Sequence, residues 1–103
     1  MNKVMVIYDK PVDVLHLRSG SAGLFEADDL DRGVELDFSI FDGQPCGATV
    51  IGFFKNQWDD DILALAQLVS KHLSVPAKVL SKQIKRTMHD VERGSVSINV
   101  QNL

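Results

Sequence analysis

The stretch that decides the fold is Val4–Arg18, VMVIYDKPVDVLHLR. Two short runs rich in β-branched residues, Val4–Tyr8 and Val14–Arg18, flank the break Asp-Lys-Pro-Val-Asp. Pro11 fixes its own φ and has no N–H to give to a strand ladder, so we expect the chain to turn there. The stretch therefore predicts an antiparallel hairpin that starts a sheet.

Working outward from the hairpin, residues 24–25 form a short apolar patch and residues 26–31 an acidic loop. Residues 34–40 (VELDFSI) then alternate apolar and polar side chains. This alternation predicts a strand with one buried face and one wet face, Asp37 lying on the wet one. Asp42-Gly43 predicts a tight turn. The return strand, Cys46–Phe54, is apolar on both faces, so we expect it to be central or covered by another layer or subunit.

Two amphipathic helices follow. We expect the first to begin near Asp59, and its apolar arc is broad enough to touch the sheet and a further surface. The second should run from Ala77 to about Arg93. Period-two alternation then predicts a closing strand at 95–101, free to add to the parent sheet or to a neighbour's edge.

These elements predict a single α+β domain, with a mainly antiparallel sheet of four or five strands and two C-terminal helices packed on one face. Residues 1–55 form its β-rich part, residues 59–93 its helical part and residues 95–101 its closing strand. The length of 103 residues fits one core. The apolar return strand, broad helix stripe and spare terminal strand favour a homodimer or higher homo-oligomer.

Composition indicates the cellular compartment in which the protein is expected. The longest uncharged run, between Asp42 and Lys55, is too short to span a bilayer, and the first residues lack the apolar core of a secretory signal. The single cysteine, Cys46, cannot form an internal disulfide. These features predict a cytoplasmic protein that does not enter membranes.

Part of the chain resembles a known family, and the residues that carry the resemblance are Ile7-Tyr8-Asp9, 12–17 (VDVLHL), 33–38 (GVELDF), Asp42-Gly43 and Gly47. They are similar to the YuzE-like family of small bacterial proteins of unknown function, over about residues 4–52. His16 stands where that family usually has an aromatic residue, and Thr49 stands near its usual acid. The resemblance implies a compact β-rich core, a bacterial origin and no established activity. It also suggests an accessory or antitoxin-like protein of a mobile genetic element.

Residues that could carry chemistry each have a structural interpretation beside the functional one. Four aspartates have two interpretations, as oxygen ligands for Mg²⁺ or Ca²⁺ or as acceptors of local backbone N–H bonds, and we favour the second: Asp9, Asp13, Asp37 and Asp42. The three histidines lack zinc-site spacing: His16, His72 and His89. Cys46 lies in an apolar strand, where a thiol more often packs than attacks. We therefore predict no metal, cofactor or catalytic residue.

Charge is unevenly distributed. Residues 1–61 carry 12 acidic and 5 basic side chains, whereas residues 62–103 carry 2 acidic and 6 basic ones. The second helix has a basic face: Lys78, Lys82, Lys85, Arg86 and Arg93. It could be solvated or could bind an acidic protein surface, and the net charge of −3 makes nucleic acid the least favoured partner. The acidic and basic halves could also meet, within one chain or across a dimer.

We consider three hypotheses for function. The first is a non-enzymatic interaction module that self-associates. The second is a small-molecule-binding protein with a pocket between sheet and helices, lined by Tyr8, His16, Phe53, Phe54 and Trp58. The third is a carboxylate-dependent enzyme. An enclosed pocket with a strongly perturbed acid would favour the second and third, and a flat apolar patch would favour the first.

Overall fold

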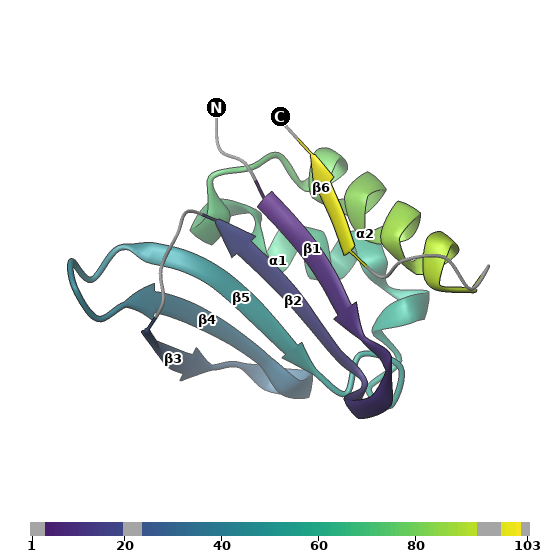
Figure 1. The fold of residues 1–103 in the computed structure, drawn as a ribbon, viewed down its shortest axis with the longest axis horizontal. Coiled ribbons are helices and arrows are strands. Elements are labelled where there is room, and N and C mark those ends of the chain that lie inside the picture. Colours follow the sequence, from purple (N-terminus) through teal and green to yellow (C-terminus); the bar gives the residue numbers. More distant parts are fainter. Residues whose placement is uncertain (1–3, 20–23, 93–97, 102–103) are drawn as a thin grey trace.

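The computed structural model describes residues 4–19, 24–92 and 98–101. In this part of the chain, six strands form one antiparallel sheet in the order β3-β4-β5-β2-β1-β6, with two helices on one face (Figure 1). The strands are β1 (Val4–Asp9), β2 (Val14–Ser19), β3 (Phe25–Asp29), β4 (Val34–Ser39), β5 (Pro45–Ile51) and β6 (Ile98–Gln101). The helices are α1 (Ile62–Leu73) and α2 (Ala77–Glu92), and the short 3₁₀ turns are η1 (Lys10–Val12), η2 (Asp31–Gly33) and η3 (Trp58–Asp60). The predicted α+β class is confirmed.

The predicted hairpin of β1 and β2 lies in the interior of the sheet, because β1 also pairs with β6 and β2 also pairs with β5. Pro11 lies in η1, which makes the turn between the two strands. Alternate residues of the hairpin are buried toward the helices: Val4, Val6, Tyr8, Leu15 and Leu17. The hairpin therefore supplies the strand half of the core.

The helices supply the other half. α1 packs against β5, and α2 packs against β1 and β6. Leu65 and Val69 of α1 are fully buried, as are Leu80 and Ile84 of α2. The wider apolar arc predicted for α1 remains in part outside this core, because Leu68 is 43% exposed. No helix in the described part of the chain is long and apolar enough to cross a membrane.

The two helices leave one end of the sheet without cover, as Figure 1 shows at the edge formed by β3 and β4. Leu36 of β4 is only partly buried, although it points to the same side of the sheet as the core residue Ala48 opposite it. Asp28 of β3, which pairs with Leu36, is exposed. We call residues 24–41 of this region the β3–β4 end.

The acidic segment predicted as a loop is instead the edge strand β3. The sheet therefore has six strands among the described residues, whereas four or five were expected. The acids of β3 lower its intrinsic strand propensity, and all five of its residues are exposed. Pairing with β4 from Phe25↔Ser39 to Asp29↔Glu35 overrides that propensity. Charged side chains are common on edge strands because they oppose unwanted strand pairing.

Two other boundaries differ from expectation. The return strand is central, as predicted, but β5 ends at Ile51, because Gly52 has a φ of +71° and turns the chain. The first helix begins at Ile62 rather than near Asp59, because residues 58–60 form the separate turn η3. The predicted closing strand corresponds to β6, which joins the parent sheet beside β1. Residues 95–97 of that prediction, and Arg93, lie outside the described residues.

Gly33 and Gly43 provide a matched test of the β4 hairpin, since both have positive φ, +77° and +71°. A Cβ at Gly33 would lie 2.0 Å from the backbone oxygen of Ile51, whereas a Cβ at Gly43 would meet nothing within 4 Å. We expect Gly43→Ala to lower the free energy of unfolding by about 1 kcal/mol, and Gly33→Ala to lower it by roughly 2 kcal/mol more. Urea denaturation measures both, and equal losses would contradict the close approach at Gly33.

Candidate functional site

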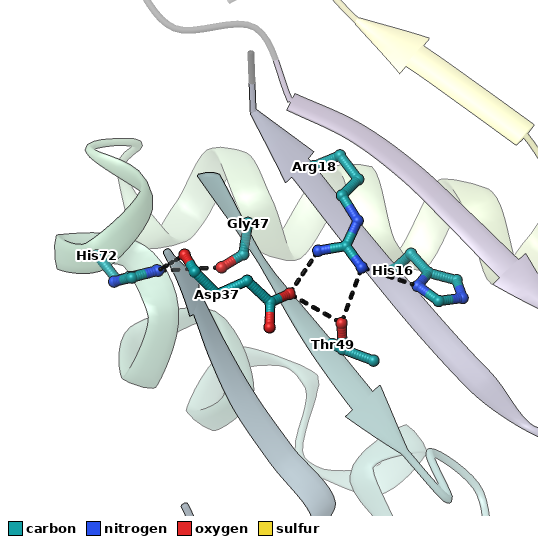
Figure 2. A network of polar contacts seen from close by, with 6 residues as sticks. All are labelled: His16, Arg18, Asp37, Gly47, Thr49 and His72. Atoms are coloured by element: carbon teal, nitrogen blue, oxygen red, sulfur yellow. Dashed lines mark hydrogen bonds and ion pairs between the residues drawn. The ribbon is translucent and has the colours of Figure 1, made fainter. Parts of the chain in front are cut away.

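The strongest polar cluster lies on the sheet face opposite the helices and is centred on Asp37 of β4 (Figure 2). Arg18 of β2 donates from Nη1 to Asp37 Oδ2 and from Nη2 to Thr49 Oγ1, the latter at 3.0 Å. Thr49 in turn donates to Asp37 Oδ2 at 2.9 Å. Arg18 and Thr49 therefore tie three adjacent strands together through one carboxylate oxygen.

Asp37 is fully buried although no helix covers this face. The guanidinium of Arg18 and the cross-strand neighbours of Asp37 provide the cover. The ring of Phe25 lies under that guanidinium, 4.5 Å from Cζ to the ring centroid. Phe25 and Arg18 thus shield the carboxylate from water, which strengthens the ion pair. The predicted wet face is wrong at this position, because its polar residue has a partner two strands away.

His16 completes the cluster, with Nδ1 3.3 Å from Arg18 Nη2. Arg18 can only donate, so His16 Nδ1 accepts and the imidazole is neutral. Burial lowers the pKa of His16 below its ordinary value of 6.5, and the positive charge of Arg18 lowers it further. Asp9 and Asp37 act in the opposite direction without reversing the shift.

A β-bulge behind the cluster connects it to α1. The pairing of β4 with β5 shifts between Asp37 and Phe38, which leaves Cys46 as the extra residue on β5. His72 of α1 places Nε2 3.0 Å from the carbonyl oxygens of both Asp37 and Gly47 (Figure 2). Both partners are acceptors, so Nε2 carries the hydrogen. His72 therefore satisfies the carbonyls at the bulge from the helix side.

This geometry describes a structural cluster rather than a reaction centre. The second carboxylate oxygen of Asp37, Oδ1, is buried and has no hydrogen-bond partner among the described residues. A substrate could reach Asp37 only by displacing Arg18. Burial also raises the pKa of Cys46, and the charge of Asp37 raises it further, so the thiol is protonated near neutral pH. His16 and His72 are hydrogen-bonded to other groups, and neither activates Cys46.

Asp13, another candidate ligand, holds two segments of the backbone together. Its carboxylate accepts hydrogen bonds from Tyr8 Oη at 2.7 Å and from the backbone N–H groups of Phe54 and Lys55 at 3.0 and 3.1 Å. Burial alone raises the pKa of Asp13, but these three donors outweigh it, and the pKa lies below its ordinary value of 3.8. Asp13 therefore fastens the loop after β5 to the hairpin turn.

The remaining aspartates do not join Asp13 or Asp37. Asp42 accepts a hydrogen bond from the backbone N–H of Gln44, two residues away, as a turn aspartate does. Asp9 is exposed at the end of β1. The described residues contain no group of three or more His, Cys, Asp or Glu side chains arranged to hold a metal ion.

The five residues of the predicted pocket do not share one site. Tyr8, Phe53 and Phe54 form an edge-to-face aromatic cluster with ring centroids 5.2 to 6.0 Å apart. Phe53 is fully buried core, and the hydroxyl of Tyr8 is engaged by Asp13. His16 lies on the other face of the sheet, so it cannot serve as a polar handle for this cluster.

Trp58, the fifth residue, is held elsewhere in the core. Its indole N–H donates to the backbone oxygen of Arg32 at 2.9 Å, and the guanidinium of Arg32 stacks 3.6 Å above its ring. Arg32 also donates to Asn56 O and to Asp61. These contacts hold Arg32 in a left-handed backbone conformation with φ +58°. Trp58 is thus a packing residue at the base of η2.

The basic face is formed as predicted where the structure describes it. Lys78, Lys82, Lys85 and Arg86 are all exposed on α2. In the described part of the chain, the ion pairs are Arg18–Asp37 and Arg32–Asp61, so none of these four α2 side chains takes part in one. Their charge is available to a partner.

The β3–β4 end gathers exposed apolar side chains: Leu24 (60%), Phe25 (39%), Leu30 (37%), Ile40 (49%) and Phe41 (76%). Leu24 and Ile40 are adjacent, since the N–H of Ile40 donates to Leu24 O at 3.3 Å. Leu24, Ile40 and Phe41 therefore lie together at the β4–β5 hairpin, whereas Leu30 lies at the other end of β3 and Phe25 lies on the opposite sheet face, against Arg18. An open hollow of about 570 Å³ lies at the other end of β3 and includes Leu30, Trp58 and Leu68 in its lining.

No protein-family model, curated protein or solved structure matches this chain. The resemblance to the YuzE-like family therefore stays a prediction.

The sequence interpretation did not identify Arg18 or Thr49 as partners of Asp37. One signal was present: Gly47 interrupts an apolar strand, where a glycine commonly marks a bulge or a close backbone approach. A Cβ at Gly47 would lie 2.7 Å from Arg18 Nη1 and 2.5 Å from Leu17 O. The glycine therefore makes room for the arginine, but its identity alone does not say which side chain fills that room.

Replacement of Arg18 tests the buried ion pair. Arg18→Met leaves the Asp37 carboxylate buried without its cation, so we expect the free energy of unfolding to fall by about 3 kcal/mol. The double variant Arg18→Met/Asp37→Asn removes the unpaired charge and should recover at least about 1 kcal/mol of that loss. Both values come from chemical denaturation at neutral pH. A loss below about 1 kcal/mol in Arg18→Met would show that the pair is not shielded from water.

The neutral state of His16 predicts a pH dependence. Since its pKa is lower in the folded protein than the ordinary 6.5, protons bind the unfolded chain more readily. The contribution of His16 is therefore complete above about pH 6.5 and is lost as the pH falls toward its folded pKa. Denaturation between about pH 7.5 and pH 5 should show a smaller loss of stability for His16→Asn than for the unsubstituted protein. Parallel curves would contradict the neutral imidazole.

Proposed function

We propose that this protein is a non-enzymatic interaction module that self-associates. The observation that carries the proposal is the β3–β4 end, where Leu24, Ile40 and Phe41 are exposed together beside an uncovered part of the sheet. Contiguous apolar surface of this kind marks interaction sites in soluble proteins. Phe41, at the hairpin tip, is its most exposed member at 76%.

The chemistry of the polar residues supports an interaction module over an enzyme. Asp37 is covered by Arg18, Asp13 is saturated with donors, and burial keeps the Cys46 thiol protonated. Each of the reactive candidates is thereby occupied with holding the fold. An enzyme needs at least one such group with access to a substrate.

Self-association also explains an exposed aromatic at a hairpin tip. Phe41 gains little by facing water, whereas an aromatic anchor buried in a partner commonly contributes more than 1 kcal/mol to binding. The single cysteine and the YuzE-like resemblance add a bacterial, cytoplasmic setting to the proposal. The same resemblance suggests an accessory or antitoxin-like role in a mobile gene neighbourhood.

Sedimentation velocity over a wide concentration range tests self-association. We expect a reversible shift from monomer to larger species, and we expect Phe41→Ser to raise the dissociation constant about tenfold by removing an aromatic anchor. Val12→Ser is the matched control, because Val12 is also exposed (59%) but lies in the β1–β2 turn. If the unsubstituted protein stays monomeric at several hundred micromolar, the proposal is refuted. If both substitutions have equal effects, the β3–β4 end does not take part in self-association.

A further inference from the structure

The β3–β4 end is acidic as well as apolar. Its exposed acids lie on β3 and at the start of η2: Glu26, Asp28, Asp29 and Asp31. Burial raises the pKa of the neighbouring Glu35, and its hydrogen bond with Asp29 raises it further. Carboxyl groups are therefore crowded along this edge. A cationic partner would relieve that crowding, whereas pairing two β3 edges would place like charges opposite each other.

The chain carries one surface of the opposite charge, the exposed face of α2. Lys78, Lys82 and Lys85 recur at intervals of four and three residues, so they share one side of the helix with Arg86 beside them. An open hollow of about 310 Å³ beside it is lined by the apolar side chains of Phe54, Ile62 and Met88 and by the polar side chains of Asp59, Lys85, His89 and Glu92. The basic face thus has a hollow of mixed polar and apolar lining next to it.

These two surfaces cannot meet within one copy. β3 is the outer strand at one edge of the sheet, and α2 packs against β6, the outer strand at the other edge (Figure 1). The molecule is 38 Å long, and ion pairs act over only a few ångströms. Each copy therefore presents an acidic, apolar end and a basic face, separated by the width of the sheet.

We propose that the β3–β4 end of one copy binds the basic face of α2 on a second copy. Asp28 and Asp31 of one copy face Lys82 and Lys85 of the next. This inference rests on the proposed self-association and names its two surfaces. A contact between unlike surfaces leaves one of each kind free, so assembly continues past the dimer unless a ring closes.

Charge reversal tests the pairing by complementation. Asp28→Lys/Asp31→Lys and Lys82→Glu/Lys85→Glu each place like charges across the contact. Each variant alone should bind itself at least about tenfold more weakly than the unsubstituted protein does in sedimentation velocity. An equimolar mixture of the two variants should associate again, because opposite charges then face each other at both contacts. The four-fold variant in one chain should also regain self-association.

Two controls separate this pairing from general effects. Lys10→Glu/Lys55→Glu has the same net charge as the α2 variant, at exposed positions outside α2, and should associate as the unsubstituted protein does. Raising NaCl from about 50 to 500 mM should weaken the unsubstituted assembly, since salt screens exposed charges. Circular dichroism confirms that every variant is folded.

The outcomes distinguish the two proposals. If the unsubstituted protein associates while both reversal variants also associate alone, or while their mixture stays dissociated, the pairing is overturned and self-association stands. If the unsubstituted protein does not associate at low or high salt, both are overturned. Loss in each variant with recovery in the mixture supports the pairing of the β3–β4 end with α2.

Discussion

Two helices cannot cover six strands, and the exposed surfaces of this protein follow from that constraint. Strands lie about 4.8 Å apart, so the outer strands of a six-stranded sheet are about 24 Å apart, whereas two packed helices are about 20 Å wide. α2 takes the β1–β6 side and α1 takes β5. The shortfall exposes β3 and leaves Leu36 of β4 only partly buried on the helix side. The opposite face of the sheet has no covering element at all among the described residues.

On the sheet face opposite the helices, the side chains of the strands themselves cover Asp37. Arg18 reaches across Gly47 to Asp37, Thr49 shares the same carboxylate oxygen, and Phe25 supports the guanidinium. The ion pair holds three strands in register because burial strengthens it. That cover has a chemical consequence. The groups best suited to acid–base or nucleophilic work are committed to the fold, which leaves association as the function that its surface favours.

The β3–β4 end receives no comparable cover. Its strand β3 carries acids on both faces, Glu26 and Asp28 on the helix side and Asp29 on the other, while Phe41 and Ile40 extend from the hairpin at one end of it. Acids on an edge strand oppose pairing with a second edge, and they also create a surface to which only a basic partner is complementary. The lysines of α2 have that chemistry at the far side of the same molecule. The same charges can thus keep the single chain soluble and attract another copy of it.

The sequence by itself determined the elements whose side-chain pattern is local. The β1–β2 hairpin followed from Pro11 between two β-prone runs, and the α1 and α2 stripes followed from helical spacing. Charge counting also located the basic face. Only the tertiary structure decided that residues 25–29 are a strand, because pairing with β4 outweighs their low propensity, and that Asp37 is buried, because its cation comes from β2. The tertiary structure likewise placed His16 on the other sheet face from the remaining four residues of the expected pocket. Local patterns report periodicity and propensity, whereas a partner distant in sequence is known only once the strands are in register.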